Sequence, residues 1–239
     1  MIFAAGLGTR LGAIGESTPK ALVEVGGQTM LERTVRGLVE AGADRIIVNV
    51  HHHADRVARF VAEHDLGAEI LVSREPERPL ETGGGLLHAR SFFRGNAPFV
   101  LHNVDVITDT DLRAMVAAHE RNHPLATLAV KERETSRYLL FDDDGLFGRE
   151  DRRHGTRFEC RTPRGDVRTL AFAGIHVCSP QLLDHITERG VFPILEVYLR
   201  LAAERHAIEP WALTGSLWLE VGNLERLESA RALLGASHT

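Results

Sequence analysis

The chain has 239 residues, of which 44% are apolar, and a formal net charge of −5. This length fits one large α/β domain or two small ones, and the balanced charge argues against nucleic acid as the main partner. No apolar stretch is long enough to span a membrane, and the first residues lack the features of a signal peptide. Two cysteines without CxxC spacing indicate neither a disulfide framework nor a zinc site, so we expect a cytoplasmic enzyme.

Apolar strands and amphipathic helices alternate through the first half of the chain. We expect strands at 1–4, 45–50, 69–73 and 99–103, and helices at 30–41, 54–64, 86–93 and 111–122. Thr29 and Glu32 have the spacing of a capping box. The alternation favours a doubly wound, mainly parallel sheet, whose ligands bind beyond the carboxyl ends of the strands. Because the first strand is short, we also expect a few residues to precede it in the complete protein.

The second half of the chain is richer in β-structure. We expect strands at 126–130, 138–142, 167–170, 174–177 and 218–221, and helices at 181–186, 194–204 and 223–234. The charged stretch 149–168 is interpreted as an exposed hairpin or flexible loop, because it contains Gly155, Pro163 and Gly165. Neither repeats nor low-complexity segments interrupt this pattern.

The most specific motif joins the first strand to a glycine-rich turn. It runs Ala5-Gly6-Leu7-Gly8-Thr9-Arg10-Leu11 and is followed by Pro19-Lys20. Glycines let backbone N–H groups approach a phosphate closely, and Arg10 and Lys20 stand where the charge of a polyphosphate would fall. A Gly-x-Gly alone is equally typical of an ordinary strand-to-loop turn, but the whole string favours phosphate binding.

This string resembles the signature of the sugar-1-phosphate nucleotidyltransferases. Glu81-Thr82-Gly83-Gly84-Gly85 and Val48-Asn49-Val50-His51-His52 are similar to the N-acetylmuramate-1-phosphate uridylyltransferase branch, as is Gly174-Ile175-His176. The resemblance implies a Rossmann-like, GT-A-like fold with an inserted β-rich, sugar-binding portion. It implies one domain over 1–239, with a nucleotide-binding half at 1–123 and a sugar-phosphate-binding half at 124–239. Uridine is the first choice of nucleoside and guanosine the second.

The resemblance also implies roles for individual residues. It makes Arg10 and Lys20 catalytic. The nucleotide-binding residues would be Ala5, Gly6, Gly8, Thr9, Glu81 and Gly84. The sugar-binding residues would be Asn103, Gly174 and Glu196, by a looser similarity.

Two carboxylates are implied as ligands of Mg²⁺. Asp105 ends an apolar strand, and Mg²⁺ favours one or two carboxylates plus substrate phosphates. An aspartate in this place is also typical of a turn or a helix cap. Glu220 lies in Trp218-Leu219-Glu220-Val221-Gly222, where the family has an aspartate, so its carboxylate would reach about one bond length further.

The implied reaction is attack of a sugar 1-phosphate on the α-phosphorus of a nucleoside triphosphate, with release of pyrophosphate. The attacking oxygen is already anionic, so the protein must supply positioning and charge neutralisation rather than a general base. Two alternatives stay open. One is a non-catalytic nucleotide or sugar-nucleotide sensor, which is favoured by Glu220 in place of the family's aspartate. The other is a cytidylyltransferase acting on a non-sugar phosphate. The resemblance leaves a homo-oligomer open.

Other functional motifs are absent or poorly formed. Leu11 stands where a dinucleotide-binding G-x-G-x-x-G would have its third glycine, and the G-K-[ST] of a P-loop is absent. No G-x-S-x-G indicates a serine nucleophile. His51, His52 and His53 would alternate sides on an extended segment, which makes them a poor shared set of metal ligands.

Overall fold

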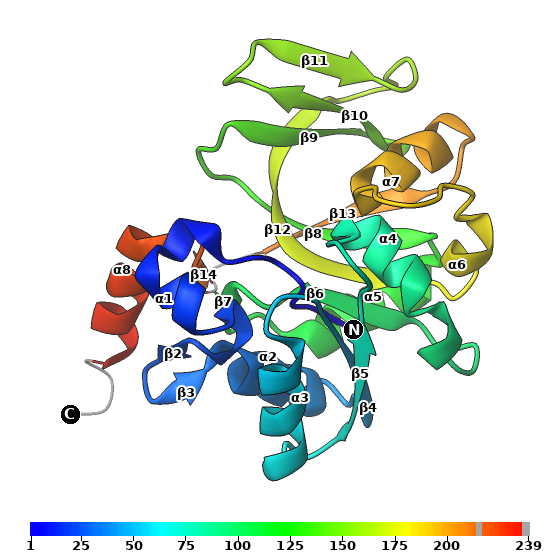
Figure 1. Cartoon of the computed structure of the whole chain (residues 1–239). Helices are drawn as coiled ribbons and strands as arrows, with labels where there is room; N and C mark the ends of the chain where they lie inside the picture. The colour runs from blue at the N-terminus through cyan, green and yellow to red at the C-terminus, as the bar shows by residue number, and fades with distance from the viewer. Residues whose placement is uncertain (214–216, 236–239) are drawn as a thin grey trace.

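The structure is a computed structural model that describes residues 1–213 and 217–235 (Figure 1). Its central feature is a ten-stranded sheet with the order β11-β10-β9-β12-β6-β1-β4-β5, in which β8 pairs with β12 and β13 pairs with β8. Its strands are β1 Ile2–Phe3, β4 Arg45–Val50, β5 Glu69–Arg74, β6 Phe99–Asn103, β8 Ala126–Lys131, β9 Arg137–Asp142, β10 Gly145–Asp151, β11 Thr156–Glu159, β12 Arg168–Cys178 and β13 Ile208–Ala212.

Helices and two small ribbons complete the described chain. The helices are α1 Ala13–Ser17, α2 Met30–Glu40, α3 Ala54–Glu63, α4 Glu81–His88, α5 Leu112–Asn122, α6 Leu182–His185, α7 Ile194–Ala203 and α8 Leu224–Gly235. Short 3₁₀ turns are η1 Thr9–Leu11, η2 Lys20–Leu22 and η3 Arg90–Phe92. The ribbons pair β2 Glu24–Val25 with β3 Gln28–Thr29, and β7 Val106–Thr108 with β14 Trp218–Glu220. No described helix has the length and apolarity needed to cross a bilayer.

The amino-terminal half forms the predicted parallel sheet. β1 pairs in parallel with β4 and β6, and β4 pairs in parallel with β5. Val48 and Ile47 of β4 point into different hydrophobic clusters and both are buried, which explains the continuous apolar run of this strand. The predicted capping box of α2 is confirmed, because the Thr29 hydroxyl accepts from the Glu32 N–H and the Glu32 carboxylate accepts from the Thr29 N–H. The predicted α/β fold is therefore confirmed.

One long strand joins the two halves. β12 pairs antiparallel with β6 at one end and with β9 at the other, so it curves from the parallel sheet into the β9–β11 layer (Figure 1). The prediction of separate strands at 167–170 and 174–177 is wrong. Gly174 has a φ of 82°, and the pairing register of β12 with β8 shifts between Phe172 and His176, so the strand bends without ending.

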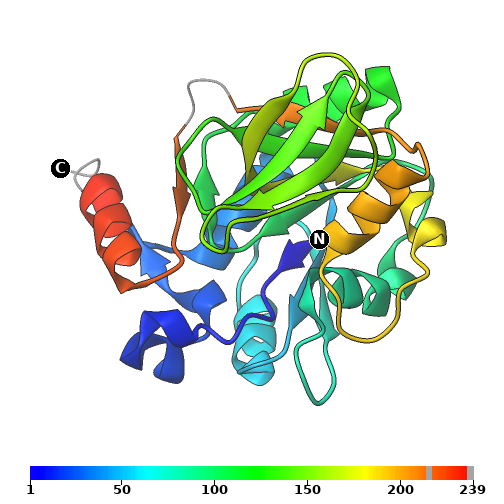
Figure 2. The same cartoon turned by 90° about the horizontal axis from the view of Figure 1, so that it is seen from above.

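The β9–β11 layer lies over the centre of the sheet, with α7 and α8 on opposite sides (Figure 2). The predicted exposed hairpin is confirmed, because β10 and β11 pair with Arg149 opposite Phe158 and every residue of β11 is exposed. The 1–123/124–239 division stays a prediction. Residues 214–216 and 236–239, which belong to the predicted carboxyl-terminal half, lie outside the described part of the chain.

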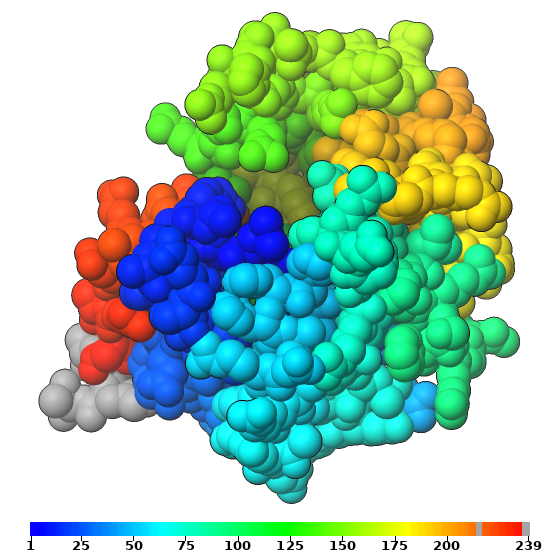
Figure 3. All heavy atoms as spheres, viewed as in Figure 1, coloured from blue at the N-terminus to red at the C-terminus, as the bar shows by residue number. Residues whose placement is uncertain are grey.

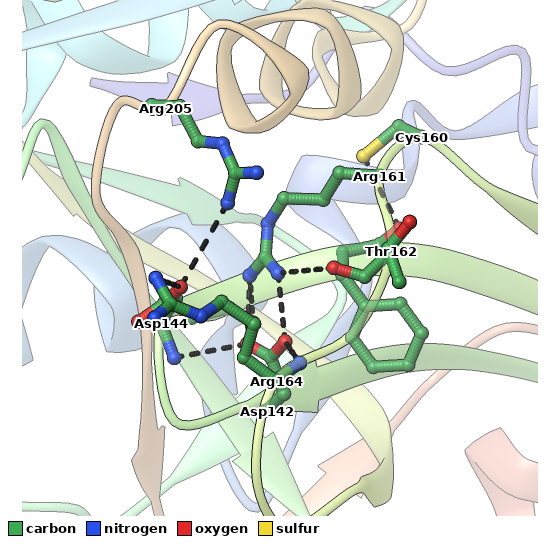
Figure 4. Close-up of polar contacts among 9 residues, drawn as sticks. Asp142, Asp144, Cys160, Arg161, Thr162, Arg164 and Arg205 are labelled. Atoms are coloured by element: carbon green, nitrogen blue, oxygen red, sulfur yellow. Dashed lines mark hydrogen bonds and ion pairs between the residues drawn. The ribbon is translucent and has the colours of Figure 1, made fainter.

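A buried ion pair anchors the far end of this layer (Figure 4). Asp142 accepts hydrogen bonds of 2.7 Å from both terminal nitrogens of Arg161 and one of 2.6 Å from the Arg164 N–H. Burial alone would raise the pKa of Asp142, but the hydrogen bonds from Arg161 and the Arg164 N–H lower this pKa to about 2. The segment after β11 is therefore fixed to the β9–β10 turn rather than free.

Candidate active site

The carboxyl ends of the parallel strands open onto one cavity of about 460 Å³. Three segments that follow strands of the parallel sheet contribute to its lining: 6–10, 81–85 and 103–105. The lining residues are Phe3–Leu11, Lys20, Asn49, Pro79, Glu81, Thr82, Asn103, Val104, Asp105 and Gly222. The space-filling view shows a hollow between the blue amino-terminal segment and the turquoise α4 segment, under the green β9–β11 layer (Figure 3).

The glycine-rich turn forms one wall of this cavity. Gly8 has a φ of 67°, a left-handed conformation that favours glycine, and its carbonyl accepts the N–H of Leu11 at 2.9 Å. Nothing lies within 4 Å of the position that a Gly6 side chain would take, so the backbone there is open to a ligand. Leu11 is buried and anchors the turn, while Arg10 of η1 is exposed at the cavity.

Lys20 and Asp105 meet across the cavity. The Nζ atom of Lys20 lies 2.6 Å from Oδ2 of Asp105, although 85 residues separate them in the chain. Their side chains are only 12% and 19% exposed, so this ion pair is largely screened from solvent by protein. The Lys20 ammonium therefore has a carboxylate partner in the structure and stands directly beside the space where a ligand would lie.

Backbone pairing between β7 and β14 brings Glu220 close to Asp105. In the β7–β14 ribbon Glu220 lies opposite Val106, and the next N–H, that of Val221, donates to the Asp105 carbonyl at 2.8 Å. The Glu220 carboxylate lies 2.5 Å from the guanidinium of Arg226, in the first turn of α8. Within residues 1–213 and 217–235 there is no group of three or more histidine, cysteine or acidic side chains that could hold a metal ion.

The Glu81–Gly85 segment differs from its prediction. The predicted helix at 86–93 leaves 81–85 outside it, but α4 already begins at Glu81 and ends at His88. The N–H groups of Gly83 and Gly84 donate to the Phe192 carbonyl at 2.9 and 3.1 Å. A Cβ on Gly83 would overlap the Phe192 ring, and one on Gly84 would overlap the Gly190 carbonyl. The three glycines thus allow close packing of α4, and within the segment only Glu81 and Thr82 line the cavity.

The predicted sugar-binding residues are spread over a wider area. Asn103 lines the cavity. Gly174 lies behind it, since a Cβ there would be 3.1 Å from the Asn103 amide nitrogen. Glu196 pairs with Arg149 at 2.5 Å, and neither it nor Gly84 belongs to the cavity lining.

Two residues near the site were not predicted from the sequence. Asn49 is 1% exposed and lies among the apolar residues of strand β4. It belongs to the Val48–His52 segment that resembles the uridylyltransferase branch, but the sequence alone indicated no role of its own for it. Arg226 was not recognised, because nothing in the sequence indicates that a residue of α8 would reach Glu220.

Comparison with known proteins decides the family. A family model described as the MobA-like NTP transferase domain matches residues 1–238. The chain belongs to the MobA-like NTP transferase domain family. This membership confirms that the protein is a nucleotidyltransferase by family and that the resemblance of the amino-terminal motif is real.

Relatives of this MobA-like protein match it over most of its length. It is 31% identical over 242 residues to the N-acetylmuramate alpha-1-phosphate uridylyltransferase of Caulobacter vibrioides, covering 98% of this chain and 96% of that protein. It is also 31% identical to the mannose-1-phosphate guanylyltransferase catalytic subunit beta of Drosophila pseudoobscura pseudoobscura, covering 93% of this chain but 58% of that protein. The fold is similar to a putative glucose-1-phosphate thymidylyltransferase from Bacillus anthracis, with a TM-score of 0.79, 19% identity, and 98% and 94% of the two chains covered.

Proposed function

We propose that this MobA-like protein transfers a uridylyl group from UTP to a sugar 1-phosphate and releases pyrophosphate. The observation that carries the proposal is the meeting of the glycine-rich turn, Arg10 and the Lys20–Asp105 pair around one cavity. The full-length similarity to a uridylyltransferase of a sugar 1-phosphate supports uridine over guanosine.

The chemistry follows from charge and position. An anionic oxygen of the sugar phosphate forms a bond to the α-phosphorus, and the bond from that phosphorus to the departing pyrophosphate breaks. The open backbone of Ala5, Gly6, Gly8 and Thr9 would hold the triphosphate. Arg10 would stabilise the β- and γ-phosphates and the leaving pyrophosphate. Lys20 would neutralise charge at the α-phosphate, which lowers the barrier because that charge rises in the transition state.

Mg²⁺ is the proposed cofactor. Asp105 and Glu220 fit it, because both are carboxylates at the cavity end of the β7–β14 ribbon and both already attract a cation, Lys20 and Arg226 respectively. These two residues would hold the ion. When bound, Mg²⁺ supplies positive charge to the triphosphate.

The sugar side of the site rests on fewer contacts. We propose that Asn103 contacts the sugar from the cavity wall and that Gly174 is needed to keep Asn103 in place. Glu81 and Thr82 would lie beside the nucleoside, with Gly84 beneath them in α4. Glu196 would reach the sugar only by leaving Arg149. Since nucleoside triphosphates are made in the cytoplasm, we propose that the enzyme works there, and a homo-oligomer stays a prediction.

A non-catalytic sensor is the second candidate. The Glu220–Arg226 ion pair favours a sensor, because the Arg226 guanidinium binds the carboxylate that is proposed to hold the metal ion. A pyrophosphate-release assay with four nucleoside triphosphates, a panel of sugar 1-phosphates and a phosphocholine-type substrate separates the candidates. Release with UTP and a sugar 1-phosphate supports the proposal. Tight nucleotide binding without release from any pair would favour the sensor, and release only with CTP and a non-sugar phosphate would favour the cytidylyltransferase.

A further inference from the structure

A buried polar pair lies at the side of the cavity proposed for the nucleoside, where Asn49 forms part of the lining and Glu75 lies behind it. Asn49 in β4 is 1% exposed, and Glu75, which follows β5, is 6% exposed. The Asn49 amide nitrogen donates to Oε1 of Glu75 at 2.5 Å. No lysine, arginine or histidine of residues 1–213 and 217–235 forms an ion pair with Glu75, so its carboxylate depends on hydrogen bonds alone. Burying a carboxylate without a cationic partner costs free energy of folding. We therefore expect Glu75 to have a role other than packing.

The pair is the centre of a chain of hydrogen bonds. The Ala4 N–H donates to Oδ1 of Asn49 at 2.9 Å, and the Leu80 N–H donates to Oε2 of Glu75 at 2.8 Å. Ala4 begins the glycine-rich turn, whereas Leu80 comes just before Glu81 on the opposite side of the cavity. The pair therefore connects the backbone of one cavity wall to the backbone of another.

Glu81 needs such support. Its φ is 59°, a left-handed conformation in which a residue with a Cβ is disfavoured by about 1–2 kcal/mol. Such strain persists where the surroundings hold it, often at functional sites. Leu80 is held from both sides, because its N–H donates to Glu75 and its carbonyl accepts the Phe192 N–H at 3.2 Å. These two bonds fix the backbone that leads into Glu81.

Gly85 shows how closely α4 approaches the pair. A Cβ on Gly85 would lie 2.5 Å from Oε1 of Glu75 and 2.6 Å from the Asn49 amide nitrogen. Any larger residue would push the helix or the pair away. The third glycine of the Glu81–Gly85 segment is thus explained by Asn49 and Glu75.

We propose that Glu75, acting through Asn49, is a positioning residue for the nucleotide. It holds the Ala4 and Leu80 backbones at a fixed separation, and thereby sets how tightly and how selectively the nucleoside binds between them. The inference rests on the proposed function, because it assumes that the nucleotide occupies this cavity.

A donor–acceptor reversal tests this role. In Glu75→Gln the new amide cannot accept from both Asn49 and the Leu80 N–H, so a buried donor loses its partner. In the double variant N49D/E75Q, the aspartate accepts from the Ala4 N–H and from the glutamine amide, whose oxygen accepts from the Leu80 N–H. The double variant therefore restores every bond with the same total charge. Glu209→Gln, which alters the exposed Asn122–Glu209 hydrogen bond far along the chain, is the matched control.

The readouts are KM for UTP and for the sugar 1-phosphate, kcat, and the UTP-to-GTP selectivity. We expect E75Q to raise the UTP KM about tenfold, with kcat and the sugar 1-phosphate KM within about threefold of the parent protein. We expect N49D/E75Q to return the UTP KM to within about threefold of the parent value. E209Q should change none of these quantities.

An unchanged UTP KM in folded E75Q would overturn the proposal, and so would an equal loss for both substrates. If E75Q does not fold, the double variant decides: a near-parental UTP KM supports the role, and a weakened or unfolded double variant contradicts it. Failure of the proposed function looks different, because the parent protein itself would then neither bind UTP nor release pyrophosphate.

Discussion

Lys20 illustrates how one side chain serves two partners. In the structure its ammonium is neutralised by Asp105 at 2.6 Å, and in the proposed reaction it neutralises the α-phosphate. A largely buried ammonium without either partner would be unfavourable. The Lys20–Asp105 pair therefore keeps the lysine at the reaction site before the substrate arrives.

Replacing Lys20 tests this assignment. We expect Lys20→Ala and, separately, Asp105→Ala to lower kcat by at least about a hundredfold. The first substitution removes a cation from the α-phosphate and the second removes a proposed ligand of Mg²⁺, so each weakens the stabilisation of negative charge in the transition state. The control is Arg59→Ala, which removes an exposed cation from α3. Pyrophosphate release at saturating substrates gives kcat, and near-normal turnover in either site variant would refute the assigned role.

Arg226 allows a test of Glu220 as a metal ligand. Its guanidinium forms an ion pair with the Glu220 carboxylate at 2.5 Å. An ion pair at the protein surface contributes roughly 0.2–1 kcal/mol of free energy. If Glu220 holds Mg²⁺, Arg226→Ala should lower the Mg²⁺ concentration for half-maximal binding up to about fivefold, as measured by calorimetric titration in the presence of nucleotide. Unchanged or weaker Mg²⁺ binding would argue against Glu220 as a ligand.

Among the secondary-structure elements, α4 is one whose start the local sequence pattern does not predict. Three consecutive glycines are typical of a loop, yet they lie inside a helix because Phe192, Gly190 and the Asn49–Glu75 pair come too close for any side chain. That closeness arises from segments far apart in the sequence. In the same way β12 runs without interruption from Arg168 to Cys178, although the local pattern predicted a break at 171–173.

Two glycine-to-alanine substitutions within helices should have opposite effects. Gly84→Ala should lower the free energy of unfolding by about 1–3 kcal/mol, because its Cβ overlaps the Gly190 carbonyl. Gly37→Ala in α2 should raise it by about 0.5–1 kcal/mol, since nothing lies within 4 Å of its Cβ and alanine is the better helix former. Urea unfolding measures both. A stabilising Gly84→Ala would contradict the packing role given to α4.

At the scale of the whole molecule, buried histidines make stability depend on pH. Burial lowers the pKa of His102 and His119 to about 4 and that of His176 to about 3. A histidine in the unfolded chain titrates near 6.5, so below that pH the unfolded state binds more protons than the folded state. The free energy of unfolding should therefore be highest above pH 6.5 and fall as the pH drops toward 4.

Urea unfolding at pH 7.5, 6.5, 5.5 and 5 checks this prediction. Each histidine that stays neutral in the folded state contributes a slope of up to about 1.4 kcal/mol per pH unit within that window. A constant or rising free energy of unfolding between pH 6.5 and 5 would show that these histidines are not held neutral by the fold.

The sequence was enough to predict the sheet and the cavity edge, because parallel strands place their carboxyl ends together. Gly6–Arg10 and Asp105 follow such strands, and Lys20 stands at a familiar spacing from the glycine-rich turn. The Asn49–Glu75 pair, the start of α4 and the Arg226 partner of Glu220 were not predictable. Each depends on a contact between residues whose separation along the chain carries no local signal.

The most direct test of the proposed function is a crystal structure with a non-hydrolysable UTP analogue and Mg²⁺. We predict that the triphosphate lies along Gly6–Arg10, with the Lys20 ammonium contacting phosphate instead of Asp105. A nucleotide bound elsewhere, with this cavity empty and the Lys20–Asp105 pair intact, would contradict it.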